Sequence, residues 1–138
     1  MEFKAFYSRY KNIALRETRR IKVAASDLGV PLGEYELIDN YCIDDSCDCR
    51  KVMVNFVEVN PPHRILATIG YGWESLEFYT KWMYGDKEFA KELVGAYLEP
   101  GGFQSQYSQN FLQIFNIRLT DDYISTIKSH YRMFKKLK

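Results

Sequence analysis

The stretch from Arg50 to Val59, RKVMVNFVEV, constrains the fold of this chain more than any other segment. It is rich in valine and apolar on both of its alternating faces, a pattern typical of a strand buried in the middle of a sheet. The following residues 60–63, Asn-Pro-Pro-His, favour a turn. Residues 64–73 then alternate again and predict a return strand, so the centre of the fold is a β-hairpin.

The turn also predicts which residues face each other across this hairpin. If it centres on Pro61 and Pro62, Arg50 faces Trp73, and Cys49 faces Glu74 just beyond the paired strands. A guanidinium opposite an indole predicts a cation–π contact, either as a structural pair or as part of a binding pocket that Glu74 and Tyr71 would complete. Gly70 and Gly72 predict a bulge or a close approach of another group to the backbone.

Before the hairpin, the patterns predict a helix and two further strands. A helix over residues 2–12 follows from helical spacing of Phe3, Phe6, Tyr7, Tyr10 and Ala14. Residues 16–24 alternate as a strand with Ile21 and Val23 on its apolar face, and residues 34–41 alternate as another.

After the hairpin the chain turns helical. We expect helices over residues 74–84, ending at Gly85, and over the stripe that runs from Phe89 to Leu98, with Asp86 as its cap. A short helix is expected around residues 111–115. Thr120 caps a last helix whose inner face is formed by Ile124, Ile127, Tyr131 and Phe134.

This order predicts an α+β fold in a single domain spanning residues 1–138. We expect a mainly antiparallel sheet of about four strands in the N-terminal half, with three to four C-terminal helices packed on one face. The other face is either solvated or a surface for a partner. The chain is 46% hydrophobic and 16% aromatic, so it can bury its core without a metal or a disulfide.

Composition also bears on location and charge. There is no long apolar run or secretory leader, and the three cysteines are an odd number, so we expect a cytoplasmic protein with reduced thiols and no membrane partner. Residues 1–25 hold seven basic and two acidic residues, and residues 128–138 hold five basic residues and no acid. Joined in space, these ends would form a positive face for nucleic acid or an acidic partner; the alternative is an ordinary solvated surface.

The most distinctive chemistry is the cluster Cys42-x4-Cys47-x-Cys49 at the entrance to the hairpin. Thiolates are the ligands that zinc prefers in structural sites, which take four donors. Glu74 is our candidate for the fourth donor, because the register places it opposite Cys49. Two alternatives stay open: reduced cysteines that pack as small apolar residues, and a redox or nucleophilic thiol, which the nearby aspartates disfavour by raising the thiol pKa.

Neither histidine lies in a catalytic motif. His63 sits in the turn at the far end of the hairpin, too far from the cysteines to be a ligand. His130 lies off the apolar stripe of its helix, so we expect it to be solvated or at the helix edge. It would reach the cysteines only if the last helix docks beside them.

One resemblance adds to this picture. The segments Gly33-Glu34-Tyr35-Glu36, Tyr41-Cys42, Cys47-Asp48-Cys49-Arg50 and Gly72-Trp73-Glu74-Ser75 together form a pattern G-x-Y…Y-C-x4-C-D-C-R…G-W-E. It resembles that of an uncharacterised prokaryotic domain family, over about residues 15–85. The resemblance implies a domain of unknown function and no activity.

Three functional hypotheses follow. The first is a non-enzymatic interaction module, with an unknown protein or a second copy of itself as partner and one structural zinc on the cysteines. The second is a small enzyme whose site lies at the corner formed by the cysteines, Arg50, Trp73 and Glu74. The third is nucleic-acid binding through Arg16, Arg19, Arg20, Lys22 and the C-terminal lysines.

Overall fold

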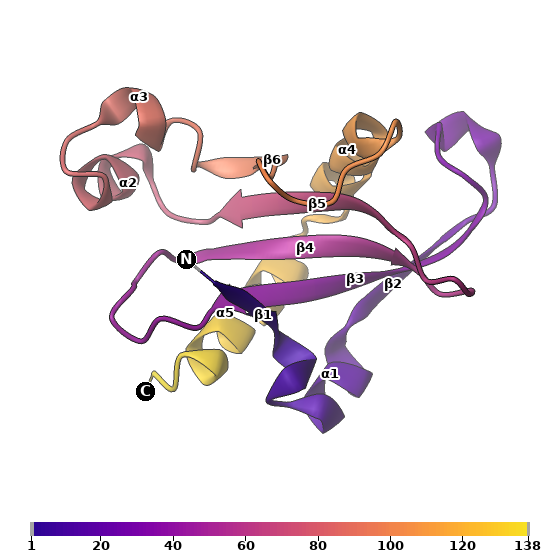
Figure 1. The fold of residues 1–138 in the computed structure, drawn as a ribbon, viewed down its shortest axis with the longest axis horizontal. Helices are drawn as coiled ribbons and strands as arrows, with labels where there is room; N and C mark the ends of the chain where they lie inside the picture. Colours follow the sequence, from indigo (N-terminus) through magenta and orange to yellow (C-terminus); the bar gives the residue numbers. More distant parts are fainter. Residues whose placement is uncertain (1, 138) are drawn as a thin grey trace.

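The computed structural model describes residues 2–137, apart from the side chain of Asp27, so Met1 and Lys138 lie outside it. An antiparallel sheet of six strands forms the centre (Figure 1). Its strands are β1 (Phe3–Ala5), β2 (Arg19–Val23), β3 (Gly33–Cys42), β4 (Lys51–Glu58), β5 (Ile65–Gly72) and β6 (Gly95–Leu98). They lie in the order β1-β3-β4-β5-β6, and β2 pairs with the other end of β3 on the β1 side. The α+β class is confirmed, with more strands than the four expected.

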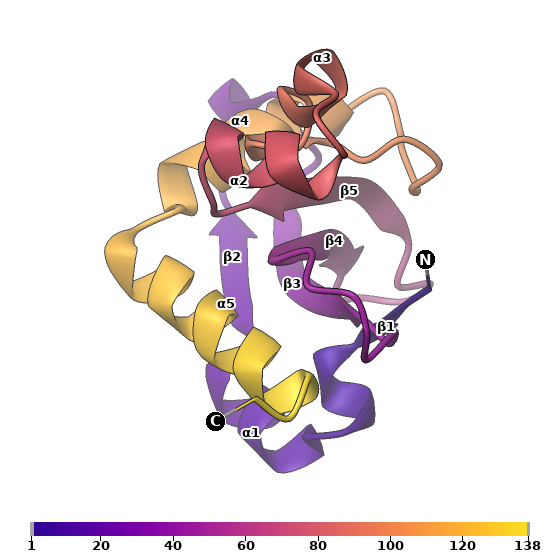
Figure 2. The same ribbon diagram turned by 90° about the vertical axis from the view of Figure 1, so that its left-hand side faces the viewer.

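The helices include α1 (Lys11–Glu17), α2 (Leu76–Trp82), α3 (Lys87–Ala90), α4 (Ser108–Arg118) and α5 (Asp121–Phe134), with short 3₁₀ turns η1 (Phe6–Ser8) and η2 (Ser26–Leu28). α4 and α5 cover one face of the sheet (Figure 2). α2 and α3 lie beyond the end of β5, and α1 lies near β1 and β2 (Figure 1). The expected caps of α3 and α5 are confirmed, since Asp86 accepts from Phe89 N and Thr120 accepts from Tyr123 N.

The central hairpin has the expected register from Lys51 to Phe56, and an irregularity after Phe56 then pairs Val57 with Ile65. Lys51 pairs with Gly72 and Val52 with Tyr71, and beyond the paired strands Trp73 N donates to Arg50 O at 3.4 Å. β4 lies between β3 and β5, as its apolar faces predicted. The alternation along β2 is confirmed as well, because Ile21 and Val23 are both buried. These segments could be predicted because, in a strand, every second side chain faces the core, so the alternation of apolar and polar residues shows which face is buried.

Gly70 and Gly72 allow a close approach by the chain itself. A Cβ at Gly72 would lie 2.1 Å from Leu93 O, and one at Gly70 would lie 2.6 Å from the ring of Tyr97. Both glycines therefore make room for the α2–α3–β6 segment, which packs across the end of β5 and supports the corner near the cysteines.

The expected helix over residues 2–12 is wrong. Residues 3–5 form β1, which pairs with residues 40–42 at the end of β3, and α1 begins only at Lys11. Aromatic residues three or four positions apart occur in helices, but they also occur where a strand leads into a turn. The unpaired edge of the longer strand β3 decided between them, because backbone hydrogen bonds across strands outweigh a weak local preference.

The expected long helix from Phe89 to Leu98 is also wrong. α3 ends at Ala90, and Gly95 adopts a positive φ of 74° before β6 pairs with β5. That conformation suits glycine and interrupts a helix. Pairing places Ala96 and Leu98 beside Tyr71 and Ile69, so β6 extends the sheet by one strand. Within residues 2–137 no helix has the length and apolar character needed to cross a membrane.

Candidate functional site

The three cysteines converge where β3 ends and β4 begins. Cys42 is the last residue of β3, and Cys47 and Cys49 lie in the loop that leads to β4. Their Sγ atoms all lie within 4.8 Å of one another. Cys42 and Cys49 are fully buried, and Cys47 is half-buried. Thiolates about 2.3 Å from a tetrahedral zinc lie roughly 3.8 Å apart, so a small contraction would bring these sulfurs to ligand spacing.

Burial disfavours ionisation of the thiols of Cys47 and Cys49. It raises the pKa of Cys49 to about 12, with a further contribution from the neighbouring Cys47. Burial and the nearby Cys42 also raise the pKa of Cys47, and Lys135 opposes them only weakly. A protonated thiol is a poor nucleophile, whereas a soft metal ion displaces the proton and binds the thiolate. The arrangement therefore suits metal binding better than thiol catalysis.

Glu74, the expected fourth donor, lies at the same corner but outside this group of ligand atoms. Its Oε1 is 3.4 Å from Arg50 Nη1. Arg50 is also held by Asp48, which accepts hydrogen bonds from Nε at 3.1 Å and from Nη2 at 2.9 Å. The guanidinium lies 4.5 Å from the ring centre of Phe78 in α2. The expected cation–π contact is thus made with Phe78 rather than Trp73, and the same guanidinium pairs with Asp48 and Glu74.

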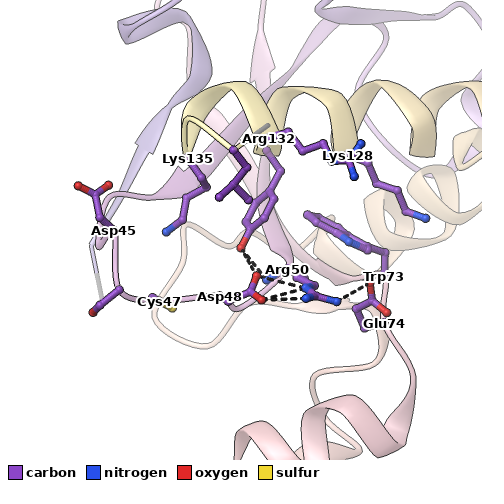
Figure 3. A pocket seen from close by; sticks show the side chains of 12 residues that line it. Asp45, Cys47, Asp48, Arg50, Trp73, Glu74, Lys128, Arg132 and Lys135 are labelled. Atoms are coloured by element: carbon purple, nitrogen blue, oxygen red, sulfur yellow. Dashed lines mark hydrogen bonds and ion pairs between the residues drawn. The ribbon is translucent and has the colours of Figure 1, made fainter.

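A pocket of about 580 Å³ opens beside the cysteines, between their loop and the C-terminal half of α5 (Figure 3). Its lining comprises Asp45, Ser46, Cys47, Asp48, Arg50, Trp73, Glu74, Lys128, Tyr131, Arg132, Lys135 and Leu137. Three residues expected at the corner of the hairpin, Arg50, Trp73 and Glu74, are therefore among those that line it. Tyr71 is not, since its buried ring packs beneath Trp73 and against Phe115.

α5 supplies the side of the pocket that local patterns did not reveal. Tyr131 donates its hydroxyl to Asp48 Oδ1 at 2.9 Å, and its ring meets Trp73 edge-on at 5.1 Å. Lys135 Nζ donates to the carbonyls of Cys42 and Asp44 at 3.3 and 2.5 Å. The basic composition of residues 128–138 was a visible signal, but the surface that α5 faces depends on how the helix docks.

His130 corrects another expectation, because it is buried with only 1% of its surface exposed. Its Nδ1 lies 2.6 Å from Asp39 Oδ2 and its Nε2 lies 2.7 Å from Glu17 Oε1. The ring stacks on Phe6 with centres 3.7 Å apart. Burial disfavours the imidazolium, but hydrogen bonds and charge from Asp39 and Glu17 outweigh it, so the pKa of His130 is raised. The histidine thus joins α1, β3 and α5, and it does not belong to the group of ligand atoms that the cysteines form.

His63 lies exposed in the turn at the far end of the hairpin, as expected. The two basic ends of the chain do meet, since Arg9 Nη1 donates to Phe134 O at 2.6 Å and Tyr10 donates to Met133 O at 2.7 Å.

Comparison with protein-family models, with curated proteins and with solved structures finds no match to this chain. The resemblance in the cysteine and G-W-E segments therefore stays a prediction.

Proposed function

We propose that this protein is a non-enzymatic interaction module in which a structural zinc, held by Cys42, Cys47 and Cys49, fixes the loop between β3 and β4. The observation that supports it is the convergence of three sulfurs within 4.8 Å. Soft thiolate donors in this arrangement favour zinc over the hard cations magnesium and calcium. Glu74 remains our candidate for the fourth donor, and its binding would require the carboxylate to leave Arg50.

A metal has a clear structural task here. The loop of residues 43–50 contains no helix or strand, and its backbone hydrogen bonds include a single turn in which Cys47 N donates to Asp44 O at 3.0 Å. A zinc would link the end of β3 to the start of β4 through this loop. It would thereby hold Asp48 and Arg50, two residues of the pocket wall, in place.

The test is the metal content of protein purified without a chelator. We expect about one zinc per chain, and we expect Co²⁺ reconstitution to produce an intense thiolate-to-cobalt charge-transfer band. The Cys47→Ser and Cys49→Ser variants should lose both signals. Ser46→Ala, a change in the same loop that leaves the thiols intact, should keep them. Folded wild-type protein that contains no zinc and binds none on titration would contradict the proposal.

An enzyme at the same corner is the second candidate, and the pocket with Cys47 on its wall favours it. In such an enzyme, the thiol of Cys47 would have to ionise although its pKa is raised. The two ideas differ in the rate of alkylation of Cys47 in metal-free protein. A nucleophilic thiol reacts at pH 7 faster than free cysteine, whereas we expect a slower reaction.

Nucleic-acid binding has less support, because two of the arginines on which it depends are already paired. Arg19 contacts Asp122 at 2.8 Å, and Arg20 contacts Glu36 at 3.4 Å. Steep salt dependence of binding to heterogeneous RNA or DNA would revive this hypothesis.

A second copy of the chain is an alternative partner for the sheet face opposite α5, and measurement of the molecular mass in solution tests it directly.

A further inference from the structure

The charges around the pocket at the cysteine corner are only partly compensated. Asp48 and Glu74 both form ion pairs with Arg50, so the charges of these three side chains are compensated within the protein. Lys135 is held by the two backbone carbonyls of the loop. The remaining charges on the wall are the exposed Lys128 and Arg132 of α5, with the exposed Asp45 on the loop opposite.

Lys128 and Arg132 lie one turn apart on α5, and both are among the residues that line the pocket (Figure 3). Within residues 2–137, neither head group has an ion pair, a hydrogen bond or an aromatic contact. Like charges at this spacing repel each other and weaken the helix slightly. An anion placed between them would relieve that repulsion and accept hydrogen bonds from both side chains.

Trp73 supplies an aromatic wall to the same pocket. Its indole is half-buried and is supported from the side by the ring of Tyr131, 5.1 Å away at an interplanar angle of 81°. No acceptor for the indole N–H is found in the described part of the chain. A rigid aromatic wall with an unused donor is suited to stack on a planar ring and to hydrogen-bond to it.

From this combination we propose that the pocket binds a small planar aromatic ligand that carries one phosphate or carboxylate group. The ring would stack on Trp73, and the anionic group would lie between Lys128 and Arg132. The pocket's volume of about 580 Å³ falls in the range of small-molecule sites. This proposal stands apart from the zinc proposal, since none of the three recognition residues is a cysteine.

The test is a titration followed by ¹H–¹⁵N NMR of the two indole N–H groups. The probes are adenosine 5′-monophosphate, indole-3-acetate, adenosine and inorganic phosphate. We expect at least one of the two planar anions to shift the Trp73 signal to saturation and to bind at least tenfold more tightly than either adenosine or phosphate. The two anions distinguish a phosphate from a carboxylate ligand. The indole of Trp82, which packs against Tyr79 in α2, serves as an internal reference.

Matched variants separate this site from a general attraction to positive charge. The double variant Lys128→Ala/Arg132→Ala should weaken binding tenfold or more, because it removes two charge-assisted hydrogen bonds. Lys87→Ala/Arg118→Ala removes the same net charge from α3 and α4 and should leave the affinity unchanged within about twofold. Trp73→Phe lacks the reporter signal, so its binding is measured by isothermal titration calorimetry; it should be weaker than that of the wild type while the circular dichroism spectrum is unchanged.

Two results would overturn the proposal. One is the absence of a saturable shift of the Trp73 signal with both planar anions at millimolar concentration, in zinc-loaded and in zinc-free protein. The other is equal affinity of the two double variants for the probe that binds.

Discussion

Two neighbouring residues of α5, His130 and Tyr131, face two polar clusters of opposite character. The cluster at His130 is closed: both ring nitrogens have carboxylate partners, Asp39 also accepts from the Tyr41 hydroxyl at 2.8 Å, and Phe6 covers the ring. The cluster at Tyr131 opens into the pocket, where Lys128 and Arg132 have no partner among residues 2–137. A polar group whose bonds are all made within the chain serves the fold, whereas unused charges beside an open pocket are available to a ligand.

The largest effect should come from the closed cluster. His130→Leu leaves the buried Asp39 carboxylate without its cationic partner, and we expect a loss of about 3 kcal/mol in the free energy of unfolding. Chemical denaturation measures it. Ser129→Ala, an exposed change on the same helix, should stay within about 0.5 kcal/mol. A loss for His130→Leu no greater than that of Ser129→Ala would show that this cluster does not hold the fold together. Partial recovery in Asp39→Asn/His130→Leu would identify the unpaired carboxylate as the cause.

Zinc comes next. If the cysteines bind zinc only in the folded state, free zinc at a hundredfold excess over its Kd should stabilise the protein by about 2.7 kcal/mol. Thermal unfolding with and without a chelator measures this. Because the core is large without the metal, we expect zinc-free protein to stay folded. Unfolding on chelation would mean that the cysteine cluster, and not the cluster at His130, is the main support of the fold.

The dependence of stability on pH sharpens the contrast further. The folded pKa of His130 is raised above its ordinary value of 6.5, so its contribution is complete below that value and is lost as the pH rises through the folded pKa. We therefore expect the free energy of unfolding of zinc-free protein to fall with increasing pH above about 6.5. His130→Leu should remove this slope between about pH 6.5 and 8, below the range in which unfolded thiols ionise. His63→Gln, which changes an exposed histidine in the turn, should keep it.

Glu74 should give the smallest effect on stability. Its contact with Arg50 is partly exposed at 3.4 Å, so Glu74→Gln should cost less than about 1 kcal/mol. The same variant tests the fourth donor of the proposed zinc site. A tenfold or greater fall in zinc affinity assigns the carboxylate to the metal, and an unchanged affinity leaves Glu74 as a partner of Arg50 alone.

Some elements of the fold could be predicted from the sequence, and others could not. The hairpin register and the caps of α3 and α5 were predictable, because each depends on residues close together in sequence. β1 and β6 were not, because each exists through pairing with a strand far away in the chain. Phe3 and Gly95 have neighbours that suit a helix as well as a strand, and only an available sheet edge decides between them.

The candidate site divides in the same way. The amino-acid sequence by itself determined that three thiols would meet beside Arg50, Trp73 and Glu74, since a loop and a hairpin register set those positions. The tertiary structure alone decided that α5 would bring Lys128 and Arg132 over this corner and place His130 between Asp39 and Glu17. Local geometry follows from dihedral preferences and alternation, whereas the docking of a helix follows from the packing of the whole core, to which every element contributes.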